Sequence, residues 1–71
     1  TVEGAEIATA KGEYLAALRT TDLARITFER EERLWQRKIS AEQDFLRART
    51  DHQEARIRLD LARQKLAALG L

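Results

Sequence analysis

The chain has 71 residues, with 13 lysines and arginines against 12 aspartates and glutamates, a formal net charge of +1 and no cysteine. This length allows one small domain or part of one. The balanced charge disfavours a nucleic-acid or anionic-membrane surface, the lack of cysteine excludes disulfides and thiolate metal sites, and no stretch approaches the ~20 apolar residues of a membrane span.

The first half of the chain has a row of mainly apolar residues with alternating spacings of three and four. A period of about 3.5 residues keeps one stripe of a helix facing a partner along its whole length. The pattern predicts a helix over about residues 4–37 that becomes regular near Gly4 and is weakened by about 1 kcal/mol at Gly12. Its seam positions are Ile7, Ala10, Tyr14, Ala17, Thr21, Ala24, Phe28, Glu31 and Trp35.

A turn is expected at about residues 38–40, followed by a second helix over about residues 41–69. Ser40 and Gln43 have the spacing of a capping box, in which each side chain bonds to the backbone N–H of the other residue. Gly70 suits the position after the end of the helix. The seam of this second helix consists of Phe45, Ala48, His52, Ala55, Leu59, Ala62, Leu66 and Leu69.

Two seams of equal period joined by a short turn predict an all-α fold. We expect a two-helix antiparallel coiled-coil hairpin over residues 1–71. Of the 31 apolar residues 12 are alanine, so the core is thin and close approach of the helices matters more than bulky filling. Because such a hairpin buries only one stripe of each helix, it is expected to depend on other contacts for its stability.

The sequence contains no recognisable catalytic constellation. There is no nucleophile paired with a base, no glycine-rich phosphate loop and no metal-ligand spacing. The single histidine, His52, falls on the seam near Phe28, which favours a packing role over a proton switch. Glu29, Glu31 and Glu32 are interleaved with arginines and indicate a solvated salt-bridge face rather than a hard-metal site. We therefore interpret the chain as a non-enzyme with no metal and no other cofactor.

Charged residues also stand four apart along the expected helices. Glu29 with Arg33 and Glu54 with Arg58 have the more favourable order for an ion pair on a helix surface. Arg25 with Glu29 has the reverse and weaker order.

Several large apolar residues fall off the seam and form flanking stripes. Exposed stripes of this kind predict lateral packing against other copies of the chain or against another protein. The residues are Leu15, Leu18, Leu23, Ile26, Leu46, Ile57 and Leu61.

The residues around the turn mix apolar and cationic side chains, which suits an interface anchor. Leu34, Trp35 and Ile39 stand there among Arg33, Arg37 and Lys38. Trp35 can instead close the seam against Ile39 and the first turn of the second helix. In that case Leu34, which lies off the seam, is the better candidate for a contact.

Four stretches carry a resemblance to a known family, and together they span the chain from its tenth residue to its end. They are Ala10–Leu18, Phe28–Trp35, Lys38–Phe45 and Ala62–Leu71. The stretches resemble the α-helical hairpin of periplasmic adaptors, also called membrane fusion proteins (HlyD-like), of tripartite efflux systems. The similarity is nearest to the heavy-metal branch of the resistance-nodulation-division pumps.

The resemblance implies a location and a set of partners. It implies a hairpin inserted between two halves of a lipoyl-like domain, in the periplasm, with the parent protein anchored to or associated with the inner membrane. The partners would be an outer-membrane channel of the TolC type, the inner-membrane pump through the missing domains, and other copies of the adaptor.

The resemblance also implies a docking tip. Arg30, Leu34 and Ser40 look like the arginine, leucine and serine that family hairpins present to the channel. The stretch between the leucine and the serine is one residue shorter than in multidrug adaptors, so Arg33 competes with Arg30 for the role, and Ser40 can serve mainly as the helix cap. The alternative function is a generic antiparallel coiled-coil scaffold or dimerisation module, which predicts further heptads outside the chain and no dependence on the tip.

Overall fold

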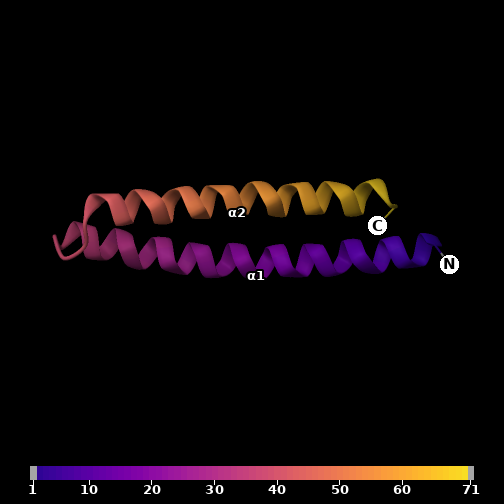
Figure 1. Ribbon diagram of the computed structural model, residues 1–71, viewed down its shortest axis with the longest axis horizontal. Coiled ribbons are helices and arrows are strands. Elements are labelled where there is room, and N and C mark those ends of the chain that lie inside the picture. The colour runs from indigo at the N-terminus through magenta and orange to yellow at the C-terminus, as the bar shows by residue number, and fades with distance from the viewer. Residues whose placement is uncertain (1, 71) are drawn as a thin grey trace.

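The computed structural model describes residues 2–70 as two long antiparallel helices joined by a short turn (Figure 1). Helix α1 runs over Val2–Gln36 and helix α2 over Glu42–Ala68. The rod measures 55 × 14 × 14 Å, with the turn at one end and both chain ends at the other. This architecture confirms the all-α hairpin. The ends of the predicted domain, residues 1 and 71, lie outside the described residues.

Burial follows the heptad seam along both helices. The buried side chains are Ala10, Phe45, Ala48 and Ala55, and the remaining seam residues are partly buried except Trp35, which is 39% exposed. Alanine lets two helix backbones approach closely, and Phe45 is the only large side chain among the buried seam residues of the described part of the chain. The core is therefore a narrow strip between α1 and α2.

Three polar contacts at different heights join the two halves of the hairpin. The Thr21 hydroxyl lies 2.7 Å from the Ala17 carbonyl oxygen in its own helix and 3.0 Å from the Ala55 carbonyl oxygen across the seam. Towards the chain ends, Lys65 pairs with Glu13 at 3.1 Å. At the turn, the Ser40 hydroxyl donates a hydrogen bond of 2.7 Å to Glu31. Because a polar group at a coiled-coil core position helps to specify register, we assign Thr21 that role here.

Helix α1 ends in a Schellman motif that the sequence does not announce. The N–H of Ile39 donates to the Leu34 carbonyl at 2.8 Å, and the N–H of Lys38 donates to the Trp35 carbonyl at 2.9 Å. Lys38 takes the left-handed conformation that this motif requires, with φ of 60°. Glycine usually occupies such a position, so lysine there costs conformational energy.

The second helix begins without the predicted capping box, which is therefore wrong. Its N-cap is Ala41, with no side-chain cap hydrogen bond, and the helix begins at Glu42. The Ser40 hydroxyl bonds to the Glu31 carboxylate instead, because a charged acceptor across the turn gives a stronger hydrogen bond than a backbone N–H does.

At the end of the rod away from the turn, the residue after α2 agrees with the expectation from the sequence, whereas the first residue of α1 differs from it. Helix α1 is already helical at Val2, two residues before the start expected near Gly4. Gly70 follows α2 with φ of 89°, which agrees with its expected position after the helix.

Replacing Gly12 by alanine should stabilise the hairpin. Gly12 lies inside α1, and a Cβ atom there would meet nothing within 4 Å. We expect Gly12→Ala to raise the free energy of unfolding by about 0.5–1 kcal/mol, measured by thermal denaturation of the 71-residue chain with circular dichroism. Gly70→Ala is the matched control: its positive φ predicts a lower melting temperature, and a rise in both variants would contradict this explanation.

Replacing Lys38 by glycine should also stabilise the hairpin, because it relieves the left-handed conformation at the end of α1. We expect a gain of about 1 kcal/mol in denaturant unfolding. Lys38→Ala separates conformation from charge, since it removes the ammonium group but keeps a Cβ. Equal gains from both variants would assign the effect to charge and not to the backbone.

Candidate functional site

The tip of the hairpin rests on a stack of aromatic rings. Trp35 and Phe45 lie face to face, with ring centroids 4.8 Å apart and an interplanar angle of 4°. Phe28 stacks on Phe45 at 5.7 Å and on His52 at 5.6 Å, so four rings form a continuous ladder across the seam. Trp35 therefore closes the seam against the first turn of α2, while Ile39 remains 67% exposed.

The histidine occupies the place that its seam position predicts. His52 is partly buried and packs on Phe28. It is the inner end of the aromatic ladder, where the alanine part of the seam begins.

Two of the predicted tip residues lie on the same side of α1. Arg30 and Leu34 are one helical turn apart and therefore neighbours, with Arg30 exposed and Leu34 partly buried. Ser40 lies beside them, because its N–H donates to the Leu34 carbonyl at 3.3 Å. Arg33 is exposed too, but it stands about 100° around the helix from Leu34. The structure thus brings Arg30, Leu34 and Ser40 together, while Arg33, three residues after Arg30, is a helical neighbour of Arg30 but not of Leu34.

The cations at the tip have no carboxylate partner among the described residues. Arg30, Arg33, Arg37 and Lys38 are all exposed, and none takes part in an ion pair within 4.0 Å in residues 2–70. Exposed cations without internal partners are free to meet the carboxylates of another molecule.

The ion pairs on the helix surfaces differ from those that the spacing favours. Glu29 pairs with Arg25 at 3.0 Å and not with Arg33, while Asp22 holds the same Arg25 guanidinium at 2.6 Å. The hydrogen bond to Asp22, followed by that to Glu29, raises the pKa of Arg25 above its ordinary value. The arrangement in which Asp22 and Glu29 both pair with Arg25 is thus preferred over the Glu29–Arg33 pair, which the order of the residues along the helix alone would favour.

Two further expectations about charged residues are not met. Glu54 and Arg58 form no ion pair with each other in the described part of the chain. The salt-bridge face expected at residues 29–33 does not form either, because Glu31 accepts a hydrogen bond from Ser40 instead.

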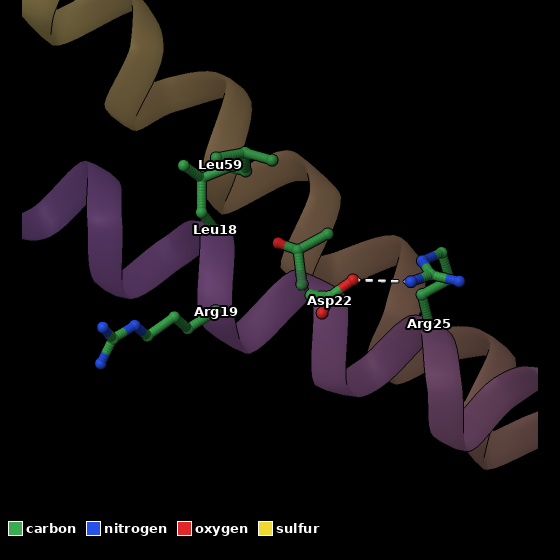
Figure 2. A pocket seen from close by; sticks show the side chains of 6 residues that line it. Leu18, Arg19, Asp22, Arg25 and Leu59 are labelled. Carbon is green, nitrogen blue, oxygen red and sulfur yellow. Dashed lines mark hydrogen bonds and ion pairs between the residues drawn. The ribbon is translucent and has the colours of Figure 1, made fainter.

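The flanking stripes are exposed, as their off-seam positions require. The large apolar residues with more than about a third of their surface in solvent include Leu15, Leu18, Leu23, Ile26, Leu46, Ile57 and Leu61. Figure 2 shows one side of the seam, where Leu18 of α1 and Leu59 of α2 lie next to each other above the pair of Asp22 and Arg25. Arg19 also lines that groove. The grooves beside the seam are shallow and open, so the sides of the rod suit contact with another surface better than enclosure of a small molecule.

The described residues hold few groups for chemistry. Residues 2–70 contain no cluster of three or more histidine, cysteine, aspartate or glutamate side chains arranged to hold a metal ion. No described helix is long and apolar enough to cross a membrane. Apart from the ladder, the conspicuous features are the tip and the exposed stripes.

A two-helix rod with stacked rings near its tip and apolar sides in solvent defines an antiparallel helical hairpin. The model of the CzcB-like, alpha-helical hairpin domain family matches residues 9–68. The chain belongs to this family. The resemblance to adaptor hairpins of the heavy-metal branch is thereby confirmed at the level of the family.

Two curated relatives are similar to the chain over 60 residues, which is 84% of this chain and 12% of each relative. One is the cobalt-zinc-cadmium resistance protein CzcB of Cupriavidus metallidurans, with 55% identity. The other is the cation efflux system protein CzcB of an Alcaligenes species, with 52% identity. The matched part of the chain thus corresponds to about an eighth of these relatives. No solved structure matches it.

The sequence alone did not indicate two features that fix the conformation of the turn. The pairing of Glu31 with Ser40 gives no sequence signal, because the two residues are nine apart and belong to different elements. The left-handed Lys38 gives none either, since lysine has no preference for that conformation. A signal existed for Thr21, a polar residue at a seam position among alanines.

Truncating Phe45 should destabilise the tip and with it the whole hairpin. Phe45 is buried between Trp35 and Phe28, so Phe45→Ala should lower the free energy of unfolding by about 3 kcal/mol in urea denaturation. Ile39→Ala removes an exposed apolar side chain from the same end and should cost less than about 0.5 kcal/mol. Similar losses from both variants would show that the aromatic ladder is not the support of the tip.

Proposed function

We propose that this hairpin is the non-catalytic arm of a periplasmic efflux adaptor. In this proposal its tip docks onto an outer-membrane channel of the TolC type, and the rest of the parent protein connects it to an inner-membrane pump. The observation that carries the proposal is membership of the CzcB-like hairpin family over residues 9–68. The names of the two relatives, which refer to cobalt-zinc-cadmium resistance and cation efflux, support metal cations as cargo of the parent system.

The dimensions of the rod support a role as a spacer. Helices of 35 and 27 residues, rising about 1.5 Å per residue, give a long arm with its tip far from both chain ends. An arm of 55 Å places a docking surface at a fixed distance from the domains that carry it. In this proposal the hairpin acts through its length and its surface, and the exported ion is handled elsewhere in the assembly.

The arrangement at the tip supports docking through Arg30 and Leu34. Leu34 offers an apolar contact beside the turn, and Arg30 on the same side offers a guanidinium without an internal carboxylate partner. We assign Ser40 a positioning role, because its hydroxyl is engaged by Glu31 and ties the turn to α1. In this proposal Arg33, a helical neighbour of Arg30 but not of Leu34, lies at the edge of the docking surface.

The exposed stripes support side-by-side packing of several adaptors. Soluble proteins rarely leave contiguous apolar stripes in water unless they bind something. Contact with other copies would bury the leucines and isoleucines along the rod and add to a core that is thin within one hairpin. In this proposal the parent adaptor works as an assembly of parallel arms.

Changing the tip should abolish docking without unfolding the arm. In the full-length adaptor, we expect Leu34→Asp to reduce crosslinking to the channel at least tenfold, because it places a charge in the apolar contact. Arg30→Glu should reduce crosslinking severalfold by reversing the charge beside it. Circular dichroism of the purified variants should remain helical.

Arg33→Glu is the matched control for Arg30, with the same change of charge at a position about 100° around the helix from Leu34. We expect it to leave crosslinking unchanged. A loss from Arg33→Glu without a loss from Arg30→Glu would transfer the role to Arg33. If Leu34→Asp and Arg30→Glu both crosslink normally while the helices remain intact, the proposed tip is wrong and the generic scaffold becomes the better explanation.

A further inference from the structure

Ile39 is a large apolar residue of the turn that the core of the hairpin does not use. It is 67% exposed, whereas Trp35 is 39% exposed and Leu34 is partly buried. The seam is closed at this end by the stacked rings of Trp35 and Phe45, so the packing of the two helices does not depend on Ile39. An exposed isoleucine at the end of a rod is therefore available for a contact with another molecule.

The end of α1 brings Ile39 next to Leu34, although the two residues are five apart in the chain. The N–H of Ile39 lies 2.8 Å from the Leu34 carbonyl oxygen, and the N–H of Ser40 lies 3.3 Å from the same oxygen. These bonds belong to the Schellman motif, in which the apolar residues at the two ends of the motif are commonly neighbours. Leu34 and Ile39 thus adjoin each other at the tip.

The position of Ile39 depends on the left-handed backbone of Lys38. Its φ of 60° turns the chain back towards α1 directly before Ile39. A residue with a Cβ atom adopts this conformation at a cost in energy, and such costs are often retained at functional sites. In this turn the retained conformation places an isoleucine beside Leu34.

The place of Ile39 on the rod limits what can cover it. Both chain ends lie at the opposite end of a rod 55 Å long, so in the proposed adaptor the rest of the parent protein joins far from the tip (Figure 1). Residues 29–44 include four cations and five acidic residues, and this balance disfavours the surface of an anionic membrane as the occupant. The surface that continues from Ile39 is the proposed docking surface of Arg30 and Leu34.

We infer that Ile39 is a second apolar contact of the docking surface, and that the channel has an apolar recess that receives Leu34 and Ile39 together. The inference rests on the proposed function, and it adds a residue that the resemblance to family hairpins does not assign. Two branched side chains held next to each other require a more closely matched recess than one does. The pair therefore makes docking selective among channels.

Protection of a single cysteine tests this contact directly in the full-length adaptor. The chain has no cysteine, and any cysteine elsewhere in the parent is replaced first. We expect the purified channel to slow the maleimide labelling of Ile39→Cys at least fivefold. Val2→Cys is the matched control, because Val2 is an exposed apolar residue at the opposite end of the rod. Its labelling rate should be the same with and without the channel.

A second set of variants separates a contact from a structural role. We expect Ile39→Gln to reduce crosslinking to the channel at least fivefold, while Ile39→Val, which keeps a branched apolar side chain, retains most of it. The melting temperature of Ile39→Gln should stay near that of the unchanged adaptor, because the side chain is largely in solvent. Val2→Gln should leave crosslinking unchanged.

Three outcomes would overturn the inference and leave the proposed function standing. In the first, the channel does not protect position 39, although Leu34→Asp still abolishes crosslinking. In the second, vesicles of anionic phospholipid protect position 39 without the channel, which would indicate a membrane contact. In the third, protection increases with adaptor concentration alone, which would indicate that two tips meet. Failure of the unchanged full-length adaptor to crosslink to the channel would instead contradict the proposed function itself.

Discussion

The close approach of two helices along an alanine seam is the constraint on which the other features of this hairpin depend. Three of the four buried residues in the described range 2–70 are alanines, and the fourth is Phe45 near the tip. Alanine brings the backbones close enough for the Thr21 hydroxyl to reach a carbonyl of the opposite helix at 3.0 Å. Because the seam is this narrow, the large apolar side chains of the flanking stripes remain outside it. Because so few side chains are buried in this fold, contacts with other molecules have to be made through its surface.

The seam changes character along the rod, and the change separates a supported tip from an alanine-rich shaft. Near the turn it is filled by stacked rings, which bury more area than alanine and have preferred relative orientations. Beyond His52 it consists largely of alanine and leucine. Side chains at the tip are therefore mounted on a well-packed base, which suits residues that must meet a partner in a defined geometry.

Periodicity alone was enough to predict the hairpin, because a repeat of three and four residues has only one economical solution when it occurs twice around a turn. The same periodicity placed His52 beside Phe28 and put the leucine stripes in solvent. The details that could not be predicted are choices between partners of similar energy. Ser40 had both a helix N-terminus and the Glu31 carboxylate within reach, and the carboxylate prevailed. The order of charged residues along α1 favoured an ion pair between Glu29 and Arg33. Glu29 instead pairs with Arg25, which also pairs with Asp22. For the candidate site the sequence indicated which residues are near the tip, and the choice between Arg30 and Arg33 stays a prediction.

The stack of Trp35 on Phe45 has a practical consequence for anyone studying this arm. Trp35 is the only tryptophan of the chain, it lies next to the turn, and 39% of its surface is in water. The fluorescence emission of an indole ring depends on its solvation and on neighbouring rings. Trp35 is therefore an intrinsic fluorophore that would respond to contact of a partner with the tip. Events at the tip can thus be followed optically without attaching a dye.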